Sequence, residues 1–117
     1  MPLDLLWWST KTIPTKNIYL VEGIIKGIIL STVSKDVDVV AHPLSHISAE
    51  TAVQLSGHNI VYFLDPEIRG EVLDDKVGLL RAAGNEVTPI YLPDNWKIDD
   101  LILAYPDKWR YMCSRTP

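Results

Sequence analysis

The sequence offers almost no cysteine chemistry. It contains one cysteine, Cys113, and three histidines. A single thiol cannot build a disulfide framework, and it excludes a cysteine-rich zinc site. A chain of this kind fits a reducing compartment, and we therefore expect a cytoplasmic protein.

Long apolar runs and an excess of basic residues are also missing. No stretch approaches the roughly 18 consecutive apolar residues of a membrane span. The apolar N-terminal run is interrupted by Asp4 and lacks the layout of a signal peptide, so we expect a soluble chain without a membrane partner. The net charge is −4, so contact with nucleic acid requires a local basic patch, a bound divalent metal or a more basic partner.

The material that is present suits one compact domain. The chain has 117 residues, of which 47% are apolar, enough for a sizeable core. We divide it into an N-terminal arm or edge strand over residues 1–16, a domain over residues 17–105 and a C-terminal tail over residues 106–117. Trp7 and Trp8 in the arm are awkward on a free monomer and favour a protein partner or a homodimer.

Strand and helix patterns alternate along the domain. β-rich runs predict strands at residues 17–21, 37–41, 59–64 and 87–92, and apolar periodicity predicts helices at residues 23–33, 48–57, 67–83 and 98–105. Such alternation implies right-handed crossovers and a three-layer α/β fold. We expect a roughly four-stranded, mainly parallel sheet with helices on both faces.

Acidic residues follow three of the four predicted strands. They are Glu22 after the first, Asp65 and Glu67 after the third, and Asp94, Asp99 and Asp100 after the fourth. Ligands of parallel sheets bind at the carboxyl ends of the strands, and carboxylates gathered there favour Mg²⁺ or Mn²⁺. The alternative is that these acids only cap the following helices. His42 and His46 follow the second strand and are candidates for contact with a nucleotide.

Four segments resemble motifs of the Toprim domain family, closest to phage-type DNA primases and small standalone Toprim proteins. They are Val21-Glu22-Gly23, Ile47-Ser48-Ala49-Glu50, Leu64-Asp65-Pro66-Glu67-Ile68-Arg69-Gly70 and Leu92-Pro93 followed by Asp99-Asp100-Leu101-Ile102. They occur in the family order over residues 17–105. The resemblance implies a Toprim-like Rossmannoid fold with Mg²⁺ or Mn²⁺ as cofactor.

The resemblance also assigns roles to residues. It makes Glu22 the catalytic acid/base and Asp65 and Glu67 metal ligands. Asp99 and Asp100 are weaker metal candidates, and Arg69, Gly70 and, more weakly, His46 are candidates for contact with substrate phosphate.

Several positions depart from the family pattern. Lys26 stands where many primases have an acid, and Lys97 replaces the first acid of the last acidic turn. Glu67 replaces the second aspartate of the third segment, and the glycine expected after the second strand is missing. The two lysines remove negative charge and weaken the expected metal site.

Three functions follow from the resemblance. The first is primase-like nucleotidyl transfer on DNA or RNA with nucleotides, by a subunit or fragment that needs a primase or helicase component as partner. The second is a Toprim-type nuclease, and the third is a non-catalytic interaction module in a replication or phage assembly. A generic nucleotide-binding domain ranks last because the sequence has neither a G-x-G-x-x-G motif nor a P-loop.

Overall fold

The computed structural model describes residues 6–9, 16–35, 37–42, 47–66 and 68–113, and the backbone of residues 114–115. Its strands are β1 (Trp7–Trp8), β2 (Asn17–Glu22), β3 (Asp38–His42), β4 (Asn59–Phe63), β5 (Glu86–Tyr91) and β6 (Ser114–Arg115). Its helices are α1 (Ile24–Thr32), α2 (Ala49–Gln54), α3 (Gly70–Ala82), the short 3₁₀ turn η1 (Pro93–Asn95), α4 (Ile98–Ala104) and α5 (Trp109–Met112).

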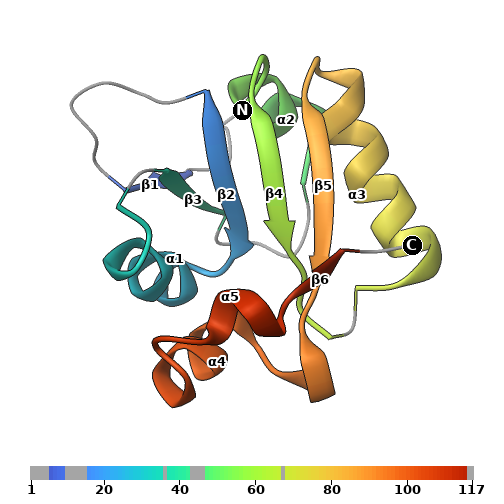
Figure 1. Cartoon of the computed structure of the whole chain (residues 1–117). Helices are drawn as coiled ribbons and strands as arrows, with labels where there is room; N and C mark the ends of the chain where they lie inside the picture. Colours follow the sequence, from blue (N-terminus) through green and yellow to red (C-terminus); the bar gives the residue numbers. More distant parts are fainter. Residues whose placement is uncertain (1–5, 10–15, 36, 43–46, 67, 116–117) are drawn as a thin grey trace.

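The six strands form one sheet in the order β1-β3-β2-β4-β5-β6 (Figure 1). The central four, β3, β2, β4 and β5, run parallel to one another, whereas β1 and β6 pair antiparallel at the two edges. The expectation of a mainly parallel α/β sheet is confirmed. Strand β1 lies in the segment predicted as an arm or edge strand and β6 in the segment predicted as a tail, so the sheet has six strands and not the roughly four expected.

Helices cover both faces of the sheet, as expected. Leu30 of α1, Leu101 of α4 and Trp109 of α5 pack with Val21 and Phe63 on one face. The other face carries a second cluster, in which α2 and α3 pack on alternate residues of the same strands. Its buried members include Ala52, Leu55, Leu73, Val77 and Leu80 from the helices and Ile18, Leu20, Ile60 and Tyr62 from the strands. The period-two alternation of the strands therefore supplies both cores.

The helix ends test the sequence patterns residue by residue. Ser48 caps α2, because its Oγ accepts a hydrogen bond from the Thr51 amide at 3.1 Å. The predicted start of α3 at residue 67 is wrong, since the helix begins at Gly70 after Arg69 in an extended conformation. Asp65 consequently lies in a loop after β4, outside the helix.

None of the helices in the described part of the chain is long and apolar enough to cross a membrane.

Candidate functional site

The strand order creates one position where ligands of open α/β sheets commonly bind. The chain leaves β2 toward β3 on one side and returns to β4 on the other, so the order reverses between β2 and β4. A crevice opens at such a switch point, outside the carboxyl ends of the two strands. Glu22 is the last residue of β2, and Asp65 follows the end of β4 by two residues. The two predicted site acids thus lie on the two sides of the switch point.

A tight turn then brings a lysine to the same place. Gly23 links β2 to α1 with a φ of 103°, a conformation that side-chain-bearing residues rarely adopt. Its amide donates to the carbonyl of His42 at 2.8 Å, which ties the turn to β3. Helix α1 starts at once, so Lys26 lies in its first turn and reaches the edge of the sheet.

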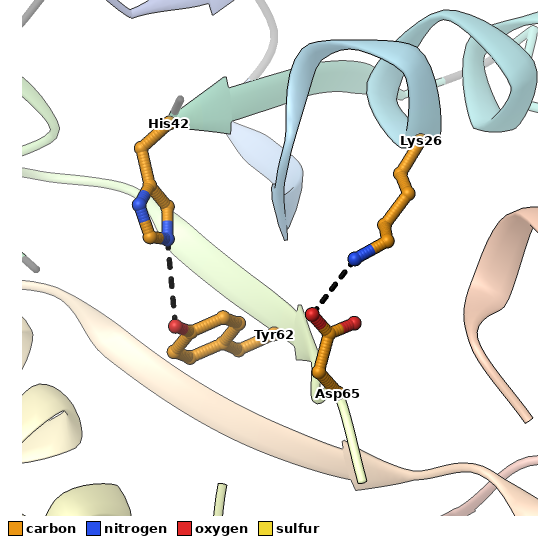
Figure 2. A network of polar contacts seen from close by, with 4 residues as sticks. All are labelled: Lys26, His42, Tyr62 and Asp65. Carbon is orange, nitrogen blue, oxygen red and sulfur yellow. Dashed lines mark hydrogen bonds and ion pairs between the residues drawn. The ribbon is translucent and has the colours of Figure 1, made fainter. Parts of the chain in front are cut away.

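Lys26 forms an ion pair with Asp65 (Figure 2). Its Nζ donates to Asp65 Oδ2 at 2.7 Å, and the two side chains are 16% and 7% exposed. An ion pair so shielded from water has a short, charge-assisted hydrogen bond, and removing one partner leaves an uncompensated charge. The carboxylate predicted to bind metal is therefore neutralised by a side chain of the same chain.

A second polar contact lies beside this pair. The hydroxyl of Tyr62 lies 3.5 Å from Nε2 of His42, a long separation for a hydrogen bond, and both side chains are buried (Figure 2). Their rings meet nearly edge to face, with centroids 6.3 Å apart. In the β2–β3 register His42 pairs with Glu22, the last residue of β2. The contact between His42 and Tyr62 therefore lies next to the carboxyl end of β2.

The pKa of the Tyr62 hydroxyl is affected by both predicted site acids, Glu22 and Asp65. Burial raises the pKa of the Tyr62 hydroxyl well above its ordinary value, and the nearby carboxylates of Glu22 and Asp65 raise this pKa further. The Tyr62 hydroxyl therefore keeps its proton to a higher pH than an ordinary tyrosine does. Because both carboxylates act on one hydroxyl, Glu22 and Asp65 belong to a single electrostatic environment.

The remaining predicted metal ligands do not join this group in the described structure. Asp99 and Asp100 lie in the first turn of α4. Asp100 is exposed, and the shielded Oδ1 of Asp99 has no hydrogen-bond partner. Glu67 lies outside the described residues. Within the part of the chain that the structure describes, no three His, Cys, Asp or Glu side chains form a group able to hold a metal ion.

The predicted phosphate contacts have local structural roles. Arg69 is exposed, its guanidinium lies 4.1 Å from the centroid of the Tyr91 ring, and its Nη1 donates to the Ile68 carbonyl at 2.9 Å. Gly70 has a φ of 56°, a backbone conformation that favours glycine. A Cβ atom at this position would meet open space, so the preference for glycine comes from the backbone and not from a neighbouring group. His46 lies outside the described residues.

Two features of the site were not foreseen from the sequence. The first is the contact of Lys26 with Asp65. The sequence does hold one signal for it, since Lys26 follows Glu22 by four positions and so lies one helical turn beyond the strand end. The second is the buried His42–Tyr62 contact, because Tyr62 was read only as part of an apolar strand. Both follow from the topology, which brings residues far apart in the sequence to one edge.

Comparison with the profiles of known protein families, with curated proteins and with solved structures gives no match for this chain. The functional argument therefore depends on the residues and on their geometry.

Proposed function

We propose that this chain is a Toprim-like, non-catalytic module of a nucleic-acid-processing assembly, in which Lys26 rather than a metal ion balances Asp65. The observation that carries the proposal is the 2.7 Å contact between Lys26 Nζ and Asp65 Oδ2. A divalent cation at Asp65 would have to displace an ammonium group from a largely buried carboxylate. The chain would then serve DNA- or RNA-processing partners as a folded docking unit.

The Toprim part of the proposal is supported by the order of motifs and by their positions on strands. Glu22 ends β2, Asp65 follows β4, and the two strands are neighbours at the switch point. Asp99 and Asp100 open α4 beyond β5. Three of the four segments that resemble the family are thus associated with the carboxyl ends of parallel strands, which supports the proposal.

The non-catalytic part is supported by the charge at the site. A Toprim-type metal site needs several carboxylates directed at one cation. The described residues do not fit that requirement, because Lys26 contributes a positive charge where an acid is expected. The same substitution weakens any role that needs Mg²⁺ at Asp65.

Metal-dependent nucleotidyl transfer, the primase-like activity, is the second candidate. One observation favours it: β2 and β4 are neighbours, so Glu22 at the end of β2 and Asp65 just after β4 are on adjoining strands, as a catalytic acid/base and a metal carboxylate would need to be. This activity requires Lys26 to leave Asp65 and requires Glu67 to complete the ligand set. A Toprim-type nuclease has the same requirements.

An activity assay with matched variants separates the candidates. The wild type and Asp65→Asn are incubated with millimolar Mg²⁺ or Mn²⁺, nucleotides and single-stranded DNA or RNA. We expect neither primer synthesis nor cleavage by the wild type alone. A metal-dependent product made by the wild type and lost in Asp65→Asn would overturn the non-catalytic proposal and support the second candidate.

A further inference from the structure

Helix α5 turns one aromatic side chain inward and the next one outward. Trp109 is 4% exposed and packs on Phe63, with ring centroids 5.9 Å apart. Tyr111 is 90% exposed, the highest value among the exposed large hydrophobic side chains. Lys108 and Arg110, which alternate with these aromatics in the sequence, are both exposed. Tyr111 is therefore an aromatic ring open to solvent, with Arg110 before it in the sequence.

A hollow lies beside α5 on the same face of the sheet. Its volume is about 240 Å³, and its lining residues are Tyr19, Val61, Phe63, Ile90, Trp109, Arg110 and Cys113. A second hollow of about 370 Å³ also includes Tyr19 and Val61 in its lining, and it continues to Asn59 near the amino ends of the strands. The two hollows adjoin at Tyr19 and Val61, and their linings come mainly from β2, β4 and β5.

The size and lining of the inner hollow define what it can hold. It is smaller than the roughly 300–1,000 Å³ of a drug-sized pocket, so it suits one planar ring. Tyr19 and Phe63 meet edge to face at 5.1 Å between centroids. The Cys113 thiol adds no negative charge, because burial raises its pKa to about 11.

One cation, Arg110, lines the inner hollow, and one acid, Glu86, lines the second hollow. Arg110 is held in place by a hydrogen bond from its Nη2 to the Val33 carbonyl at 3.1 Å, and its guanidinium lies 5.1 Å from the centroid of the Trp109 ring. Lys108 is a second exposed cation near Arg110 in the sequence, and the exposed Asp107 precedes it. Fixed cations beside exposed aromatics are the elements with which proteins hold single-stranded nucleic acid.

We propose that α5 and the adjoining hollows form a binding site for single-stranded nucleic acid. One base stacks on Tyr111, a neighbouring base enters the hollow beside Tyr19 and Phe63, and the phosphates between them lie against Lys108 and Arg110. Stacking on aromatics over an open sheet face needs no particular base sequence. The site uses none of the residues of the Glu22–Asp65 crevice and requires no metal ion.

The test is fluorescence anisotropy of a fluorescein-labelled single-stranded oligothymidylate, measured with the full chain in EDTA at low salt. We expect saturable binding that weakens as salt rises, because phosphate contacts release counterions. Tyr111→Ala should weaken binding about tenfold, within the range for loss of one stacked base. Lys108→Gln should weaken binding and reduce the dependence of affinity on salt.

Two surface variants serve as matched controls. Val53→Ala removes an exposed apolar side chain on α2, and Lys97→Gln removes an exposed charge ahead of α4, and both should bind like the wild type. Asp65→Asn should also bind like the wild type, which separates this site from the proposed function. The proposal is overturned if the wild type does not bind, or if Tyr111→Ala binds as tightly as Val53→Ala. Binding that does not respond to salt would also overturn it, because phosphate contacts with Lys108 and Arg110 must weaken as salt rises.

Discussion

The Nζ atom of Lys26 lies 2.7 Å from Oδ2 of Asp65, across the carboxyl edge of a parallel sheet. Thirty-nine positions separate the two residues in the sequence. The tight turn at Gly23 and the return of the chain to β4 bring them together. This contact decides how the site can function, because it replaces the cation that a carboxylate cluster would otherwise require.

The ion pair should be worth measurable stability. Lys26→Met removes the charge while keeping most of the side-chain volume, and it leaves Asp65 shielded without its partner. We expect a loss of about 1–3 kcal/mol in the free energy of unfolding, below the range for fully buried pairs because Lys26 is partly exposed. Urea denaturation measures it.

The double variant Lys26→Met with Asp65→Asn provides the control. Removing both charges should recover much of the loss, since neither partner is left uncompensated. If Lys26→Met unfolds at the same urea concentration as the wild type, the contact does not form in solution.

Tyr62 predicts a dependence of stability on pH. Its pKa is raised in the folded state above the ordinary value of 10.0, so above pH 10 the unfolded chain loses this proton while the folded chain keeps it. The contribution of the buried Tyr62 hydroxyl to the free energy of unfolding is fully present below pH 10 and decreases as the pH rises further. The stability of the wild type should therefore fall more steeply than that of Tyr62→Phe between pH 9 and pH 11, about the pKa of tyrosine.

The urea midpoints of both proteins across that pH range measure the difference. The other tyrosines and the lysines also titrate there, but they are present in both proteins and cancel in the comparison. Parallel pH profiles would show that Tyr62 titrates normally and is not enclosed as described.

Cys113 should react slowly in the folded protein. Burial raises the pKa of its thiol from 9.0 to about 11, and its Sγ donates to the Trp109 carbonyl at 3.3 Å. Because the thiolate is the reactive form, we expect labelling by a thiol-specific disulfide reagent at pH 8 to be about a hundredfold slower than in urea. Equal rates would mean that the segment after α5 is open in solution.

Two glycines offer a matched test of how α1 packs on the sheet. A Cβ at Gly27 would lie 2.7 Å from the Cβ of Ala41 and 3.2 Å from the ring of Trp7. Gly27→Ala should therefore lower the free energy of unfolding by about 1–3 kcal/mol. Gly78 lies on an exposed position of α3 with open space around it, and Gly78→Ala should raise the same quantity by about 0.5–1 kcal/mol.

Thermal or urea unfolding of the wild type and the two variants measures both changes in stability. Similar stabilities for Gly27→Ala and Gly78→Ala would contradict the close approach of α1 to β3 and β1.

The sequence predicted the alternation of strands and helices well, because apolar runs such as residues 59–64 and a cap such as Ser48 are local signals. It also placed Glu22 and Asp65 at strand ends. The start of α3 was predicted wrongly, because Arg69 is extended and the helix begins only at Gly70. For residues 1–16 the sequence predicts an arm or an edge strand without deciding between them, and it predicts no strand at β6, because two-residue strands form through pairing with distant segments and leave no periodic pattern.

The site was predicted in part for the same reason. Strand-end positions are readable from the sequence, but contacts between ends depend on the order of strands. Lys26 was recognised as a lost acid, yet its role as the partner of Asp65 depends on β2 and β4 being neighbours. The inward turn of Trp109 and the outward turn of Tyr111 likewise depend on how α5 docks on the sheet.

The central claim, that Lys26 occupies the place of a cation at Asp65, is tested most directly by a Mn²⁺ titration followed by electron paramagnetic resonance of the free ion. The wild type, Lys26→Met and the double variant Lys26→Met with Asp65→Asn are compared. We predict no binding by the wild type at millimolar Mn²⁺, affinity at least about tenfold higher in Lys26→Met, corresponding to about 1.4 kcal/mol, and loss of that gain in the double variant. Binding of Mn²⁺ by the wild type as tight as by Lys26→Met would contradict the claim.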